Sequence, residues 1–212
     1  MYFLLTVFQH VFFYYQPDYL FINNFFNIVR QMKKLEIEEM GRMNKEQFAQ
    51  SVKLPLTIVF DNVRSLYNIG SVFRTADAFR LEKIILCGIS ATPETNNTEI
   101  HKTALGAEET VLWSYCSDTF SAVSDLKGQG YVIVSLEQVH DSISLDSFVP
   151  SEKHKYALVI GNEVHGVDQK VVDTSDFSLE IPQFGTKHSL NVSVSAGIAI
   201  WEFARKLKNM LD

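Results

Sequence analysis

The sequence predicts an α/β fold in which a parallel sheet is covered by helices on both faces. Short apolar runs alternate along the chain with segments of helical periodicity. The apolar runs do not alternate with polar residues, which indicates strands that are buried on both sides. Buried strands separated by helices are typical of parallel sheets with helices on each face.

Six strands and three main helices follow from the apolar periodicity. A helix is predicted over 68–79 because Ile69, Val72, Phe73 and Ala76 fall on one side of it. A second helix over 119–127 ends at the glycines that follow it, and a long helix covers 191–208. The polar stretch 91–102 is interpreted as a mobile loop. Strands are predicted at 56–60, 83–89, 110–113, 131–136, 157–160 and 177–181.

Composition divides the chain into three parts, 1–31, 32–53 and 54–212. Residues 1–31 are apolar and aromatic but lack the basic start of a signal peptide, and polar residues interrupt any membrane span. We interpret them as a mis-assigned upstream translation; the alternative is a genuine membrane-associated or packing extension. Residues 32–53 are expected to form a short helical lead-in to the main domain, 54–212. We expect a cytoplasmic protein with no membrane partner.

Charge and cysteine content exclude several classes of site. The 212 residues carry a net charge of −6, the wrong sign for a chain that coats nucleic acid by bulk charge. A nucleic-acid partner would therefore need a local basic patch. Cys87 and Cys116 do not form a CxxC motif, and both are interpreted as inert thiols. The histidines show no metal-ligand spacing, so no metal is expected.

Three polar segments follow predicted strands directly, at 61–68, 161–166 and 182–191. Ligands of open parallel sheets bind at the carboxyl ends of the strands, so these segments are expected to form one site. The chain contains neither GxGxxG nor GxxxxGK[ST], and the usual dinucleotide and triphosphate cradles are absent. Gly161 and Gly166 bracket a loop whose backbone could close around a flat ring; the alternative is two ordinary turn glycines.

Three motifs carry a family resemblance: Asn68-Ile-Gly-Ser-Val-Phe-Arg74, Val159-Ile-Gly-Asn-Glu-Val-His-Gly166, and the run from Ile181 through Ser189-Leu-Asn191 to Ala196. In this order they resemble the motifs of SpoU/TrmH-type RNA 2′-O-ribose methyltransferases. The resemblance implies a SPOUT fold with a C-terminal trefoil knot, S-adenosylmethionine as cofactor, tRNA or rRNA as substrate, and a homodimer whose sites are completed by the partner chain. The alternatives are a non-catalytic RNA-binding protein of the same fold and an unrelated α/β enzyme such as a dehydrogenase.

The resemblance also implies catalytic residues. Arg74 would either activate the ribose 2′-hydroxyl or position the ribose, and positioning suits a guanidinium better because its pKa exceeds about 12. Asn68 would hold Arg74 or a loop carbonyl, or cap the helix that it opens. Glu163 would pair with Arg74 or Asn68. Ser189 and Asn191 would line the site near the methyl group, and Asn191 could also cap the last helix.

The same motifs imply binding residues. Apolar side chains and backbone groups of the second and third motifs would enclose the adenine of the cofactor, and ordinary core packing is the alternative. Scattered basic residues would contact RNA phosphates, and solvated surface charges are the alternative. The cofactor residues are Ile160, Gly161, Gly166, Ile181 and Leu190, and the RNA candidates are Arg64, Arg80, Lys102, Lys187 and His188.

Overall fold

The computed structural model describes residues 33–36 and 38–211, so the interpretation of residues 1–31 falls on a part of the chain outside this description. The chain divides into two units, Met1–Met43 and Asn44–Asp212. The first contains the short turn η1 (Glu38–Met40). The second begins with helix α3 (Lys45–Gln50), whose cap residue Asn44 exchanges side-chain and backbone hydrogen bonds with Gln47.

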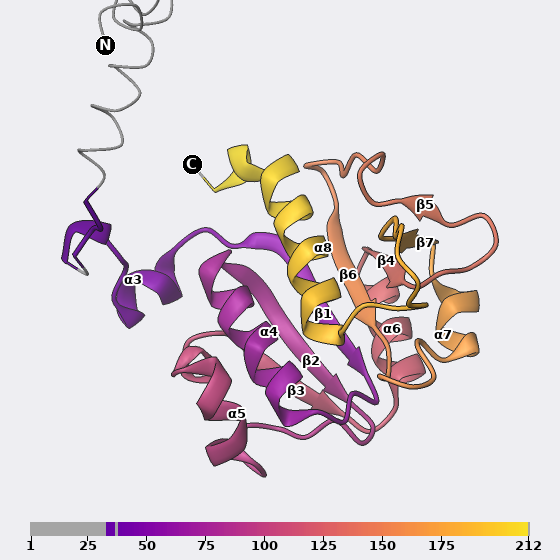
Figure 1. Ribbon diagram of the computed structural model, residues 1–212, viewed down its shortest axis with the longest axis horizontal. Helices are drawn as coiled ribbons and strands as arrows, with labels where there is room; N and C mark the ends of the chain where they lie inside the picture. Colours follow the sequence, from indigo (N-terminus) through magenta and orange to yellow (C-terminus); the bar gives the residue numbers. More distant parts are fainter. Residues whose placement is uncertain (1–32, 37, 212) are drawn as a thin grey trace, which may run out of the picture. The chain divides into compact units, whose positions relative to one another are not determined.

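The second unit is built on a parallel sheet whose strands run in the order β3-β2-β1-β6-β4-β7-β5 (Figure 1). Each paired neighbour in it is parallel. The interior strand β1 is buried along its whole length, as its nearly continuous apolar sequence predicts. The strands are β1 (Leu54–Asp61), β2 (Leu81–Cys87), β3 (Trp113–Cys116), β4 (Tyr131–Leu136), β5 (Ile143–Ser144), β6 (Lys155–Ile160) and β7 (Phe177–Glu180).

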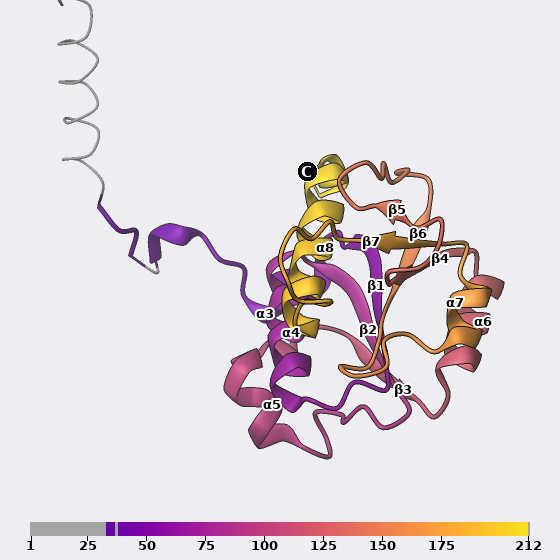
Figure 2. The same ribbon diagram turned by 45° about the vertical axis from the view of Figure 1, so that its right-hand side comes forward.

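Helices cover both faces of this sheet, which confirms the predicted α/β class. Figure 2 shows α4 (Leu66–Ala78) and α8 (Val192–Lys206) on one face, and α6 (Thr119–Gly128) and α7 (Gln169–Thr174) on the other. Alternate residues of β1 serve the two cores. Ile58 packs in the core with α4 and α8, whereas Val59 packs in the core with α6 and α7.

Helix α5 (Asn97–Ala104) corrects the prediction of a mobile loop at 91–102. The polar composition of this stretch hides two buried apolar residues, Ile100 and Ala104, one helical turn apart. They pack α5 against α4 at close range. A Cβ atom built on Gly70 of α4 would lie 2.3 Å from the carbonyl oxygen of Ile100, so the contact requires a glycine there.

Three further details differ from the predictions. Strand β3 lies at Trp113–Cys116, later than the predicted 110–113, because Val111 donates its amide to Ala107 in a preceding turn. Helix α4 is capped by Ser65, so Asn68 lies inside its first turn. Strand β5 and helix α7 have 2 and 6 residues, too few for a periodic signal.

Strand order does not establish the trefoil knot, which stays a prediction. Across 33–36 and 38–211, no helix combines the length and apolarity that crossing a membrane would require.

Candidate functional site

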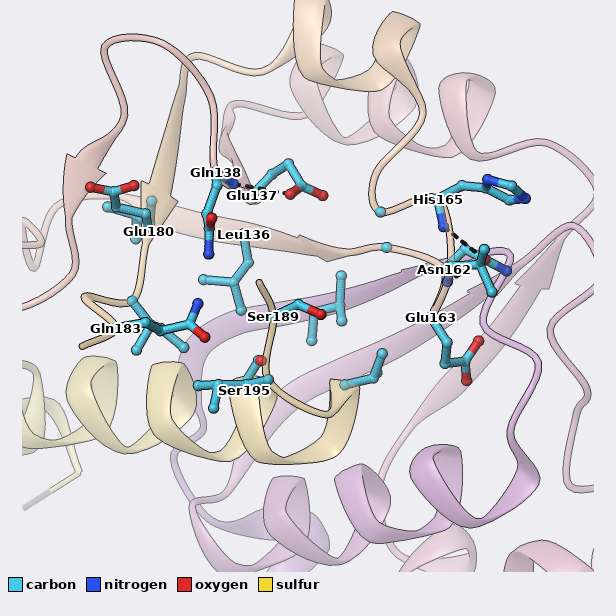
Figure 3. Close-up of a pocket in the computed structure, with 18 residues that line it drawn as sticks. Leu136, Glu137, Gln138, Asn162, Glu163, His165, Glu180, Gln183, Ser189 and Ser195 are labelled. Atoms are coloured by element: carbon cyan, nitrogen blue, oxygen red, sulfur yellow. Dashed lines mark hydrogen bonds between the residues drawn. The ribbon is translucent and has the colours of Figure 1, made fainter. Parts of the chain in front are cut away.

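A cavity of about 280 Å³ opens at the carboxyl edge of the sheet. Figure 3 shows its side chains converging from the ends of β4 and β6, from the segment after β7 and from the start of α8. The second and third predicted polar segments therefore meet in one site. The lining residues are Leu136, Glu137, Gln138, Ile160, Gly161, Asn162, Glu163, Val164, His165, Gly166, Leu179, Glu180, Ile181, Gln183, Ser189, Leu190, Val192 and Ser195.

The first polar segment joins the site through a hydrogen-bond network. The side-chain amide of Asn68 donates to Glu163 Oε1 at 3.2 Å. Asn191 Nδ2 in turn donates to Asn68 Oδ1, also at 3.2 Å. Asn68 is only 8% exposed, so both ends of its amide are satisfied away from water. One residue from each of the three motifs thus belongs to a single chain of contacts.

Glu163 holds the start of α4 as well as Asn68. Its carboxylate accepts the backbone amide of Arg64 at 3.0 Å and that of Ser65 at 2.9 Å. Partial desolvation by itself would raise the pKa of Glu163, but these amide donors, together with Asn68, hold it below its ordinary value. The carboxylate is therefore an ionised acceptor that is already engaged, and proton transfer is a poor use of it.

Asn191 caps the last helix, as predicted, but it is not among the residues that line the cavity. Its side-chain oxygen accepts the amides of Ser193 at 2.9 Å and Val194 at 3.3 Å, which caps the amino end of α8. Its nitrogen is left free to donate to Asn68. The cap orients the amide, so the start of α8 and the start of α4 are held together.

The turn after β6 forms one wall of the cavity. Asn162 and Gly166 exchange two backbone hydrogen bonds of 2.9 and 3.0 Å across it. Gly166 has a φ of +68°, which favours glycine. A Cβ atom on Gly161 would lie 2.1 Å from the carbonyl carbon of Gly166, so the two glycines are needed because the strands of the turn touch.

All five residues predicted to bind a cofactor line this cavity, and so do the predicted catalytic residues Glu163 and Ser189. Glu137 and Gln138 lie outside every segment predicted to form the site, and Gln183 lies in one of them but was given no role. Glu137 and Gln138 directly follow the apolar run 131–136. That position, the carboxyl end of a predicted strand, is the signal that could have identified them. The predicted cofactor residues are Ile160, Gly161, Gly166, Ile181 and Leu190.

Arg74 is not brought into this site. It is an exposed residue of α4 and is not among the residues that line the cavity. In the part of the chain that the structure describes, the Arg74 side chain makes no ion pair. Glu163 instead bonds Asn68, which is the other partner expected for it. The reason is helical geometry: the α4 side that packs on the core carries Ile69, Val72 and Phe73.

The RNA candidates separate into two groups. The first group, Arg64, Lys187 and His188, is exposed. It lies beside the site: the Arg64 amide donates to Glu163, and the carbonyl of His188, which follows Lys187, accepts from Gln138 Nε2. Arg80 directly precedes β2, at the opposite edge of the sheet, and its guanidinium donates to the carbonyl of Leu211. Lys102 is an α5 residue that pairs with Glu99. Neither Arg80 nor Lys102 gathers with the site.

The described residues offer no cluster of side chains for a metal site. Among residues 33–36 and 38–211, no group of three or more His, Cys, Asp and Glu side chains is arranged to hold a metal ion. Cys87 is buried, and burial raises the pKa of its thiol to about 12. Such a thiol stays protonated near neutral pH.

Comparison with known proteins identifies the family. The model of the SpoU rRNA Methylase family matches residues 55–201, and the chain belongs to this family. The 23S rRNA (guanosine-2′-O-)-methyltransferase RlmB of Neisseria meningitidis is 32% identical over 162 residues, which are 73% of this chain and 61% of that protein. RlmB of Nitrosomonas europaea is 32% identical over 160 residues, 71% of this chain and 56% of that protein. The chain thus spans less than two thirds of these relatives.

Solved structures agree on the fold. The A. aeolicus TrmH/SpoU tRNA modifying enzyme has a TM-score of 0.68 at 24% identity, over 79% of this chain and 83% of that chain. The AdoMet-bound rRNA methyltransferase from Sinorhizobium meliloti has a TM-score of 0.66 at 24% identity, over 78% of this chain and 62% of its own. The SpoU/TrmH resemblance predicted from the three motifs is confirmed.

Proposed function

We propose that this protein transfers a methyl group from S-adenosylmethionine to a ribose 2′-hydroxyl of tRNA or rRNA. The observation that carries the proposal is the contact chain Glu163–Asn68–Asn191, which ties the three family motifs together beside one cavity. Family relatives named as guanosine-2′-O-methyltransferases, and a neighbour solved with AdoMet, support the reaction and the cofactor.

The cavity suits this cofactor chemically. Its walls combine aliphatic side chains such as Ile160, Ile181 and Leu190 with the backbone of the Gly161–Gly166 turn. Apolar walls with a few polar groups are typical of sites for flat rings. Glu137, Glu163 and Glu180 are acidic, and no Lys or Arg is among the lining residues, which favours a cationic ligand. When bound, S-adenosylmethionine supplies an electrophilic methyl group on a positively charged sulfur.

The chain's own residues would orient the RNA for attack. We infer that Arg74 binds a phosphate and fixes the ribose, since a guanidinium is a poor base near neutral pH. Fixing two reactants in position can contribute up to about 7–11 kcal/mol. Arg64, Lys187 and His188 are exposed beside the cavity and would supply the local basic patch that a net charge of −6 requires.

The proposed functional unit is a homodimer. Val194, Ile198 and Trp201 form an exposed apolar stripe along α8 and are 49%, 39% and 55% exposed. They recur at helical spacing on the side away from the core, which is typical of a helix that packs on a partner. Arg74 does not line the cavity of its own chain, so we infer that it reaches the cavity of the partner chain. Helix α4, which carries Arg74, packs beside α8, the helix that carries the proposed dimer contact.

Methyl transfer from labelled S-adenosylmethionine to unmodified tRNA and, separately, to unmodified rRNA tests the reaction. Nucleoside analysis should find a 2′-O-methyl nucleoside in one pool. Label on a base would overturn the ribose assignment. Cofactor binding with no transfer to either pool would contradict the two substrate classes, and no cofactor binding at all would favour a non-catalytic RNA-binding protein.

A further inference from the structure

Glu137 is a cavity residue that lies outside the three family motifs. It follows β4 directly and lines the cavity. Its Oε2 atom accepts the backbone amide of Val167 at 2.9 Å, and its Oε1 atom accepts the amide of Gln138 at 3.0 Å. A side chain at the end of β4 thus holds the backbone that follows the turn after β6.

A second carboxylate holds the next amide of the same turn. Asp61, at the end of β1, accepts the amide of Asp168 at 2.7 Å and the hydroxyl of Thr119 at 2.6 Å. Asp61 is 2% exposed and is not among the cavity residues. Consecutive amides, those of Val167 and Asp168, are therefore fixed by carboxylates from two different strands. Only Glu137 does this from inside the cavity.

The contact between Glu137 and the turn is close. A Cβ atom built on Gly166 would lie 2.1 Å from Glu137 Oε2, so the carboxylate fills the space that a side chain at 166 would need. Figure 3 shows Glu137 directed toward the segment that carries His165, whereas the carboxylate of Glu180 points away from it. Glu137 and Glu180 thus differ in their contacts, although both line the same cavity.

We propose that Glu137 is a positioning residue that sets cofactor affinity by holding the Gly161–Val167 turn at a fixed distance from the end of β4. The proposal rests on the proposed function, because S-adenosylmethionine is the ligand that this wall would contact. Hydrogen bonds to a carboxylate are stronger than hydrogen bonds between neutral groups. Losing one in the wall of a binding site typically weakens ligand affinity tenfold or more, where each tenfold corresponds to about 1.4 kcal/mol.

Two variants separate positioning from simple attraction between charges. Glu137→Gln keeps one oxygen, which can accept the Val167 amide, but it loses the charge and the acceptor of the Gln138 amide. Glu137→Ala has neither oxygen and no charge. Positioning predicts a Kd for S-adenosylmethionine within about threefold of wild type in Glu137→Gln, and at least about tenfold weaker in Glu137→Ala. The KM for the cofactor should rise in the alanine variant while kcat changes little. Equal losses in the two variants, or unchanged binding in Glu137→Ala, would overturn the proposal.

Amide hydrogen exchange without cofactor gives an independent readout. The Val167 amide should exchange faster in Glu137→Ala and stay protected in Glu137→Gln. Glu180→Ala is the matched control, since it removes a carboxylate from the same cavity and should leave Val167 protection unchanged. Thermal unfolding shows whether each variant is folded. Wild-type protein that binds no S-adenosylmethionine would refute the proposed function alone, whereas unchanged exchange at Val167 in Glu137→Ala would refute the role of Glu137.

Discussion

Asn191 donates a hydrogen bond from its side-chain nitrogen to Asn68 Oδ1 at 3.2 Å, although the two residues are 123 positions apart in the sequence. The bond joins the start of α8 to the first turn of α4. Asn68 also donates a hydrogen bond to Glu163, and Glu163 accepts the backbone amides of Arg64 and Ser65, which precede α4. The two helices that flank the cavity are therefore fixed by one buried amide.

Removing this amide should destabilise the protein. Asn68→Ala deletes both side-chain hydrogen bonds and leaves Asn191 Nδ2 without its partner, so we expect a loss of about 1–3 kcal/mol in the free energy of unfolding. Urea denaturation measures it. The control is Ser124→Ala on the exposed side of α6, which should change stability by less than about 0.5 kcal/mol. Equal stability of Asn68→Ala and wild type would show that the contact chain does not hold the helices.

Arg74→Ala should keep cofactor affinity and lose most methyl transfer, about 100-fold or more if positioning is its role. Calorimetry and labelled methyl transfer measure the two quantities. Unchanged turnover would remove Arg74 from the mechanism.

A mixing experiment tests whether Arg74 acts on the partner's cavity. Leu190→Arg puts a long charged side chain into the cavity and should abolish cofactor binding. Mixed dimers of Arg74→Ala and Leu190→Arg chains then contain one site with a free cavity and an intact partner arginine. Activity should return in the mixture, whereas an arginine acting within its own chain predicts an inactive mixture.

Ile198→Asp should dissociate the proposed dimer, because a carboxylate in the middle of the Val194–Trp201 stripe would lose its hydration in an interface. Sedimentation analysis should show a dimer for wild type and a monomer for the variant. Gln169→Asp, at the exposed start of α7, is the control and should stay dimeric. A monomeric wild type would contradict the dimer.

Glu202 gives a pH-dependent prediction. Hydrogen bonds and charge from Arg205, and then Lys206, lower the pKa of Glu202 to about 2 against a partial desolvation that would raise it. Lys206 also donates to the carbonyl of Asp146, so the group anchors the loop after β5. A lowered folded-state pKa stabilises the protein above the unfolded value of 4.5, and this contribution is lost as the pH falls from there toward 2.

Glu202→Gln should therefore be less stable than wild type at pH 7, by on the order of 1–2 kcal/mol after allowance for solvent screening. The difference should shrink below pH 4.5 and vanish near pH 2. Urea denaturation at a series of pH values measures it, with Glu152→Gln, which is an exposed residue, as a control. A difference that stays constant with pH would show that the effect is not electrostatic.

The α/β class, the long and continuously apolar strands, and the three motif segments can all be predicted from the sequence alone. The second and third of these segments line the cavity, and the first joins them through the hydrogen bonds of Asn68. The period of the apolar residues is set by neighbours in the sequence, so β1, β4 and α8 could be predicted from local patterns. Family motifs identified the cofactor residues from Ile160 to Leu190, all of which line the cavity.

Helix α5, the position of Arg74 and the contact of Glu137 could not be predicted from local patterns, because they depend on contacts between residues far apart in the sequence. Helix α5 is polar by composition and forms where Ile100 and Ala104 meet α4. Arg74 belongs to the first motif yet lies outside its own cavity, since helical geometry turns position 74 away from the buried side of α4. Glu137 contacts Val167 across 30 positions, and no local pattern encodes which strand end will face that turn.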